Sequence, residues 1–275
     1  MTIYEHMLAE YGNTKGTNNP HAEQEVCQKI VLAGLARGGF FKYAAFYGGT
    51  CLRIIHDLPR FSEDMDFTLT EKRNDIHLED YFPAIIDEFS LTGHKVEIVK
   101  KDKKLFDRVE SAFLKESSEV YDIKFQTRRM VKIKIELDID PPLGFTTENK
   151  ILLRPYSFSV RCVTLPDLFA GKMHALLFRA WQKRVKGRDW YDFEWYVRQG
   201  VPLDFAHLQA RIKEFNNADL SPDLFRQMLA DKIASTDINL VKQDVERFVF
   251  NPRDIAIWST EYFLELANRI CYQHS

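Results

Sequence analysis

The fold expected for this chain is decided by two nearby stretches, Tyr47-Gly-Gly-Thr-Cys-Leu-Arg53 and Arg60-Phe-Ser-Glu-Asp-Met-Asp-Phe67. The Gly48-Gly49 turn lets backbone N–H groups approach a phosphate, because glycine has no side chain to block it. The alternation in the second stretch predicts a half-buried strand with Asp64 and Asp66 on its polar face. Two carboxylates on one face can hold Mg²⁺ together with substrate phosphates. This combination is typical of an enzyme that acts on a nucleoside triphosphate.

Each motif has an ordinary structural explanation when it is taken alone. A glycine pair is often only a turn, and Asp-x-Asp is often only the solvated face of an edge strand. Their order is what favours a phosphate site: a strand over 43–47, the two glycines, a helix over 50–57 ended by Pro59, and then the acidic strand. The start of the helix at Thr50 would present free N–H groups to a phosphate.

A second strand, over residues 131–139, has the clearest alternation in the chain. Its apolar face carries Val131, Ile133, Ile135, Leu137 and Ile139, and its polar face is crowded with charges of both signs. Phosphoryl transfer often uses two metal ions, so a third carboxylate is needed. Glu136 lies deepest in the strand and is our first choice, with Asp138 second. The alternative is an exposed face stabilised by lysine–glutamate pairs.

The pattern of elements predicts an α+β fold. A helix is expected over 21–38, helices over 78–89 and 105–115, and strands over 95–100 and 157–163. From Leu165 onward only helical periodicity is found, over 165–183, 190–198, 203–215, 223–234, 239–248 and 258–270. We therefore expect a core domain over residues 1–165 and a helical domain over residues 166–275.

Composition excludes several classes of protein. The chain has 275 residues, four cysteines without a Cys-x-x-Cys pair, and a net charge of −2, which argues against a zinc ribbon and a polycationic binder. No apolar run reaches the ~20 residues of a membrane span, and the N-terminus does not read as a signal peptide. We expect a cytoplasmic protein with no membrane partner. Six Lys/Arg without an acid between Gly171 and Arg188 predict a local basic surface, although a charge run is usually a solvated face.

Four further residues, Lys172, Arg188, Asp189 and Asp192, have spacing that by itself favours structural roles. Asp189 can cap its helix, and Arg188 can form an interdomain salt bridge. A lysine at the front of a helix can also neutralise a triphosphate.

The motifs resemble those of the AbiEii/AbiGii-type nucleotidyltransferase toxins of abortive-infection toxin–antitoxin pairs. The resemblance covers about residues 30–200 and rests on the two opening stretches, Lys134-Ile-Glu-Leu137, Gly171-Lys-Met-His-Ala-Leu-Leu177 and Arg188-Asp-Trp-Tyr-Asp192. It implies a DNA-polymerase-β-like nucleotidyltransferase core, a helical C-terminal domain, NTP as substrate and Mg²⁺ (or Mn²⁺) as cofactor. It also implies a tRNA 3′ end as acceptor and a cognate antitoxin as partner.

Site residues follow from the same resemblance. Asp64, Asp66 and Glu136 would bind the metal, and Lys172 would join them in catalysis. The nucleotide would be bound by Gly48, Gly49, Thr50, Ser62, Lys172, Arg188, Asp189 and Asp192. The chain departs from the family's pattern in one respect, because Glu136 stands where aspartate is usual, which leaves Asp138 as the alternative ligand.

The sequence thus predicts a metal-dependent nucleotidyltransferase that transfers NMP to an RNA hydroxyl and acts as a toxin. Two alternatives remain open at this point. The acceptor can be a small molecule or a protein, or the chain can be a catalytically silent module that binds nucleotide or a partner.

Overall fold

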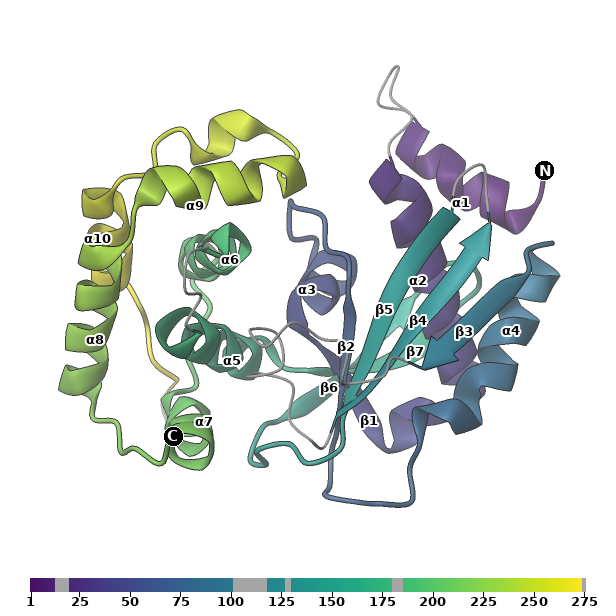
Figure 1. Cartoon of the computed structure of the whole chain (residues 1–275), viewed down its shortest axis with the longest axis horizontal. Coiled ribbons are helices and arrows are strands. Elements are labelled where there is room, and N and C mark those ends of the chain that lie inside the picture. Colours follow the sequence, from purple (N-terminus) through teal and green to yellow (C-terminus); the bar gives the residue numbers. More distant parts are fainter. Residues whose placement is uncertain (13–19, 101–117, 127–129, 180–184, 274–275) are drawn as a thin grey trace. The chain divides into compact units, whose positions relative to one another are not determined.

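The computed structural model describes residues 1–12, 20–100, 118–126, 130–179 and 185–273 (Figure 1). By its internal contacts the chain divides into two units, the first comprising residues 1–57, 62–141 and 147–162 and the second residues 58–61, 142–146 and 163–275. The expected division after residue 165 stays a prediction. The contacts differ from it in placing two short segments, Leu58–Phe61 and Pro142–Thr146, with the second unit.

The first unit is built on a seven-stranded sheet in the order β3-β4-β5-β2-β1-β7-β6. The strands are β1 (Ala44–Tyr47), β2 (Met65–Leu69), β3 (Val96–Lys100), β4 (Ser118–Gln126), β5 (Met130–Asp138), β6 (Thr147–Leu152) and β7 (Phe158–Val163). The sheet is mixed, because β2 pairs antiparallel with β1 and parallel with β5. The strand that carries Asp66 therefore lies in the middle of the sheet, with a neighbour on each side.

Helices α1 (Ile3–Gly12), α2 (Pro20–Arg37), α3 (Gly48–His56) and α4 (Phe82–Leu91) belong to the same unit. The apolar face of β5, with Ile133, Ile135 and Leu137 fully buried, lies against α2, which also packs on α4 (Figure 1). The two helices approach closely at Gly34, where an added Cβ would lie 2.7 Å from the Cα of Ile85. The polar face of β5 is thereby left on the opposite side of the sheet.

The second unit is helical. The elements that the structure describes after β7 are α5 (Leu165–Phe178), α6 (Gly187–Arg198), α7 (Phe205–Asn216), α8 (Pro222–Ser235), α9 (Ile238–Val245), α10 (Thr260–Asn268) and two short 3-10 turns. Aromatic side chains fill its core. The ring of Phe169 stacks on Tyr196 at 4.5 Å between centroids, and Phe263 meets Trp190 at 4.9 Å edge to face.

The expected combination of strands and helices is confirmed, with several differences in detail. Strands β4 and β6 were not predicted. In β4 the apolar residues Tyr121, Ile123 and Phe125 alternate with polar ones, but Glu119 and Val120 break the pattern, and β6 is a half-exposed strand at the sheet edge. Helix α3 begins at Gly48 rather than at Thr50, and α5 ends at Phe178, before the expected Lys183. The helix expected over 105–115 falls outside the described residues. Across the described part of the chain, none of the helices has the length and apolar content that a bilayer crossing requires.

Candidate active site

The glycine turn lies directly against one of the predicted metal ligands. Gly48 has φ of 80°, in the left-handed region that favours glycine. A Cβ added at this position would lie only 2.5 Å from Oδ2 of Asp66, so any other residue would displace that carboxylate. The first residues of α3, including Gly49 and Thr50, have no helical partner for their N–H groups. The N–H groups of the first helical turn and a carboxylate thus come together at the start of this helix.

Strand pairing decides which acid of β5 faces Asp66. In the parallel β2–β5 pair Asp66 is the partner of Glu136, whereas Asp138 is the partner of Thr68. Neighbouring strands lie about 4.8 Å apart, so the side chains of Asp66 and Glu136 start from adjacent positions on one face. Asp64 lies one residue before β2, on the same side as Asp66 by the alternation of the strand. The register favours Glu136 over Asp138 as third ligand.

A lysine stands among these acids. The Nζ atom of Lys134 lies 3.0 Å from Oε2 of Glu136, and both side chains are largely buried. Burial opposes the charge of Lys134, but attraction to Glu136, Asp64 and Asp66 outweighs it and raises the pKa of the lysine. Its ammonium group therefore stays charged and partly neutralises the three carboxylates.

The donor chemistry of this cluster fits a hard divalent cation, which prefers carboxylate oxygens. As the side chains stand, no three Asp, Glu, His or Cys residues among those described converge closely enough to form a ready-made ion site. The carboxylate of Glu136 is paired with Lys134, whose Nζ lies 3.0 Å from Oε2. The register places the backbones of Asp66 and Glu136 side by side, which suits a shared ion, and Lys134 already binds the carboxylate of Glu136.

The segment that leads into Asp64 is held by its backbone carbonyl groups. Gln28, buried in α2, donates from Nε2 to the carbonyl oxygens of Ser62 and Glu63, each at 3.0 Å. Gln24 donates to the Glu63 carbonyl at 3.1 Å, and the Thr50 hydroxyl donates to the carbonyl of Asp64. Three consecutive carbonyl groups are thus fixed by side chains. This arrangement gives Thr50 a positioning contact that the sequence did not reveal.

Helix α3 is tied to α2 by a bidentate ion pair. Arg53 donates from Nε to Oε1 of Glu25 at 2.6 Å and from Nη2 to Oε2 at 3.1 Å. Bidentate arginine–carboxylate pairs restrict orientation as well as distance. Arg53 therefore fixes the helix that begins at the glycine turn.

Four predicted site residues belong to the second unit, where three of them form one network. The ammonium of Lys172 lies 2.8 Å from both Oδ1 of Asp189 and Oδ2 of Asp192. Arg179 also binds Asp189, at 3.2 Å, and Arg60 binds Asp192 through two bonds of 2.6 and 2.7 Å. Asp192 is completely buried, and cations occupy both of its oxygens. It contacts Lys172 directly and is positioned to hold it.

Charges near Asp189 change two pKa values. Burial alone would raise the pKa of Asp189, but Lys172 and Arg179 outweigh it and hold that pKa below its usual range. Burial lowers the pKa of Lys186 to about 8, aided by Arg179. Arg188, the fourth predicted residue, lies with its guanidinium 4.4 Å from the ring centre of Phe248. Part of the expected basic surface is therefore neutralised or stacked within the unit.

Sequence reasoning missed Arg60, Gln28, Lys134 and Asp122. Arg60 and Lys134 stand inside the quoted motifs, and that position was the available signal. The sequence did not indicate that Asp122 lies near the site, because the strand that carries it, β4, was not predicted. It is buried on the polar face of the sheet opposite Lys134, and its Oδ2 lies 2.9 Å from Lys132 Nζ.

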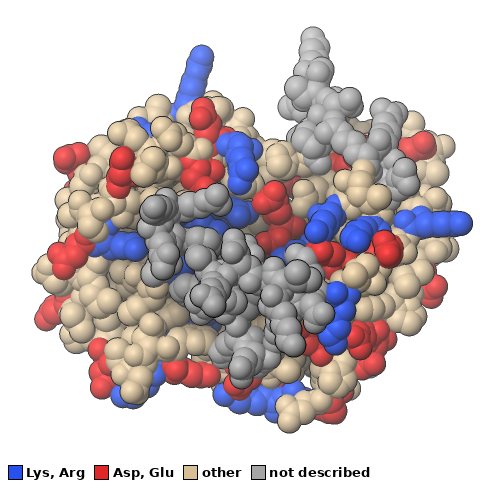
Figure 2. Space-filling view, in the orientation of Figure 1, with Lys and Arg blue, Asp and Glu red and all other residues tan. Residues whose placement is uncertain are grey.

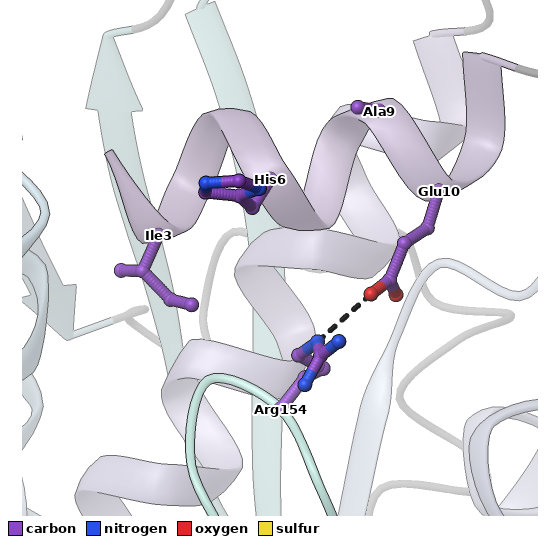
Figure 3. Close-up of a pocket in the computed structure, with 5 residues that line it drawn as sticks. All are labelled: Ile3, His6, Ala9, Glu10 and Arg154. Carbon is purple, nitrogen blue, oxygen red and sulfur yellow. Dashed lines mark hydrogen bonds and ion pairs between the residues drawn. The ribbon is translucent and has the colours of Figure 1, made fainter. Parts of the chain in front are cut away.

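Two surface features lie outside this cluster. Acidic and basic side chains are interspersed over the face drawn in Figure 2. A pocket in the first unit is lined by Ile3, His6, Ala9 and Glu10 of α1 and by Arg154, which pairs with Glu10 at 2.8 Å (Figure 3). None of the predicted site residues lines this pocket.

Comparison with known proteins identifies the family. The model of the family described as "Nucleotidyl transferase AbiEii toxin, Type IV TA system" matches residues 30–265. Among curated protein sequences, none matches this chain. Of the solved structures, JHP933 from Helicobacter pylori is similar at 18% identity and a TM-score of 0.55, over 92% of this chain and 91% of that one. MenT4, a nucleotidyltransferase toxin from Mycobacterium tuberculosis, is similar at 12% identity and a TM-score of 0.61, over 98% and 88%.

The match to this family model places the chain in the class of nucleotidyltransferases. The chain is a member of the AbiEii family of nucleotidyltransferase toxins of type IV toxin–antitoxin systems. The resemblance predicted from the sequence is thereby confirmed. The alternative of a catalytically silent binding module is excluded. Membership implies an NTP substrate and a cognate antitoxin.

Proposed function

We propose that the chain transfers a nucleoside monophosphate from an NTP to an RNA hydroxyl, at the 3′ end of tRNA, with Mg²⁺ or Mn²⁺. The observation that carries this proposal is the contact between the Gly48 turn and Asp66, together with the register that sets Glu136 opposite Asp66. Phosphate-binding N–H groups and carboxylates for a cation thus meet at one end of α3.

Each residue has a role in this proposal. Asp64, Asp66 and Glu136 would hold the divalent ion, which when bound supplies positive charge to the α-phosphate region. The N–H groups at Gly48, Gly49 and Thr50 bind the outer phosphates. The contacts to the carbonyl groups of Ser62, Glu63 and Asp64 hold the acidic strand in place, so these residues need little rearrangement when substrate arrives.

The four predicted residues of the second unit keep their nucleotide-binding roles as part of the proposal. Lys172 is the candidate for charge neutralisation, because its side chain is 15% exposed whereas that of Asp192 is fully buried. Asp189 and Asp192 orient the ammonium group. Arg188 offers a second cation stacked on Phe248. We also propose that the first unit is a DNA-polymerase-β-like core and the second a helical domain, as the resemblance implied.

The test is incubation of the purified protein with each of the four α-³²P-labelled NTPs, Mg²⁺ and total tRNA. We expect label at the tRNA 3′ end. Periodate-oxidised tRNA, which lacks the terminal hydroxyl groups, is the matched control and should accept no label. Asp64→Asn and Asp66→Asn should each reduce transfer by about 10³-fold or more, with unchanged circular dichroism and melting temperature.

Other outcomes separate the alternatives. Label that appears only in protein or in an added aminoglycoside would show that the acceptor is a protein or a small molecule instead of RNA. Transfer that persists in EDTA, or in both aspartate variants, would overturn the metal site. Equal labelling of intact and oxidised tRNA would rule out the 3′ hydroxyl as the acceptor.

A further inference from the structure

Lys134 occupies the place on the sheet where a cation is expected to act. It lies two residues before Glu136 on the same face of β5, and its Nζ atom is 3.0 Å from Oε2 of that residue. Asp66, on the neighbouring strand β2, and Asp64, one residue before that strand, also attract it. Its side chain is 23% exposed and that of Glu136 is 15% exposed, so the pair is only weakly screened by water.

The position of Glu136 makes this contact consequential. Its backbone is in register with Asp66, yet its carboxylate is paired with Lys134 and forms no ready-made triad with the other acids among the described residues. A divalent ion held by Glu136 would share its carboxylate with the ammonium group of Lys134, whose Nζ lies 3.0 Å from Oε2. Two cations on one carboxylate repel each other.

We propose that Lys134 is a positioning residue that competes with the divalent ion for Glu136, holding the acidic cluster together until the ion displaces it. This inference rests on the proposed metal site of Asp64, Asp66 and Glu136. Without a cation, the carboxylates of Asp66 and Glu136 would repel each other on adjacent strands. Lys134 removes this repulsion and leaves the third ligand on the correct face.

Competition between Lys134 and the divalent ion predicts the direction in which the affinity for the ion changes when Lys134 is replaced. Removing the positive charge of Lys134 frees Glu136 and makes the cluster more negative, so a divalent ion must bind more tightly. For unit charges a few ångströms apart in a partly buried site, the expected change in Kd is about tenfold or more. If Lys134 instead only supported the strand, its removal would leave Kd unchanged or weaken binding.

The experiment is a Mn²⁺ titration of the full chain without nucleotide, followed by the electron paramagnetic resonance signal of free Mn²⁺. Lys134→Met should lower Kd by about tenfold or more, and Lys134→Arg, which keeps the charge, should stay within about threefold of the unaltered protein. Lys132→Met is the matched control, because this lysine lies on the same face of β5 but pairs with Asp122 and is 54% exposed. Its Kd should change by less than about threefold.

The outcomes distinguish the inference from the function on which it rests. If Asp64→Asn and Asp66→Asn bind Mn²⁺ as the unaltered protein does, the proposed metal site is wrong. If those variants lose binding while Lys134→Met binds with the original Kd or more weakly, the site stands and the competition is overturned. Should Lys134→Met fail to fold, Lys134→Gln takes its place, and equal Kd values for the Gln and Arg variants would equally overturn the proposal.

Discussion

Arg60 and Asp192, 132 residues apart in the sequence, form a fully buried bidentate ion pair, with Nε to Oδ1 at 2.6 Å and Nη2 to Oδ2 at 2.7 Å. Arg60 also donates to the carbonyl group of Phe61 at 2.9 Å. Nearby, the Tyr191 hydroxyl donates to the carbonyl of Pro59 at 3.1 Å. The four residues Leu58–Phe61, which directly precede Ser62, are thereby fixed to α6.

Arg60→Met should lower the free energy of unfolding by about 3–5 kcal/mol, because it leaves Asp192 buried with one partner fewer. Arg60→Lys keeps the charge but loses the second bond, so a smaller loss is expected. Urea denaturation measures both. Arg226→Met is the matched control, since its pair with Asp223 is exposed, and it should cost no more than about 1 kcal/mol. Similar losses for the buried and the exposed arginine would contradict the prediction.

Glu136→Gln should abolish transfer and weaken Mn²⁺ binding, whereas Asp138→Asn should retain most of both. The reason is the register, which sets Glu136 opposite Asp66 and Asp138 opposite Thr68. Glu136→Asp should keep partial activity, because it retains the carboxylate. Initial rates of NMP transfer and Mn²⁺ titration check these expectations. The reverse order, with Asp138→Asn inactive and Glu136→Gln active, would assign the third ligand to Asp138.

Gly48→Ala should destabilise the first unit and abolish transfer. The left-handed backbone costs a non-glycine residue about 1–2 kcal/mol, and the new Cβ would displace the Asp66 carboxylate. Gly93→Ala is the matched control, because Gly93 has φ of 79° but no atom within 4 Å of the added Cβ. Both variants should lose similar stability from the backbone, and only Gly48→Ala should lose activity. Full activity in Gly48→Ala would separate the turn from the reaction.

The stability of the second unit should fall as pH is lowered from about 6.5 to about 4. Burial, aided by Arg211, lowers the pKa of His174 to about 4 and that of His207 to about 4. Below the ordinary value of about 6.5, the unfolded chain binds protons that the folded chain does not. Each histidine therefore adds up to about 1.4 kcal/mol per pH unit to the decline.

Urea denaturation between pH 4 and pH 7 checks this window. The double variant His174→Gln and His207→Gln should show a shallower decline than the unaltered protein. His77→Gln is the control, because Glu119 raises the pKa of this exposed histidine and its contribution has the opposite sign. An equal slope in the double variant and the unaltered protein would refute the role of the buried histidines.

Local periodicity was sufficient for much of the first unit. The alternation of residues 131–139 predicted β5, and the spacing of residues 21–38 predicted α2, because each pattern reflects one buried face. Strand β4 was not predicted because the alternation of Tyr121, Ile123 and Phe125 with polar residues is short and breaks at Glu119 and Val120. The glycine pair was recognised as a turn, but its contact with Asp66 depends on the pairing of β1 with β2.

The sequence by itself determined the family, the acidic strand and the glycine turn, because these depend on residue type and on spacing within a few positions. Only the tertiary structure decided that Glu136 rather than Asp138 faces Asp66, that Lys134 pairs with Glu136, and that Arg60 is buried against Asp192. Alternation assigns a side chain to a face of a strand, but hydrogen bonds between strands set its register. A buried ion pair likewise exists only when two distant segments exclude water around it.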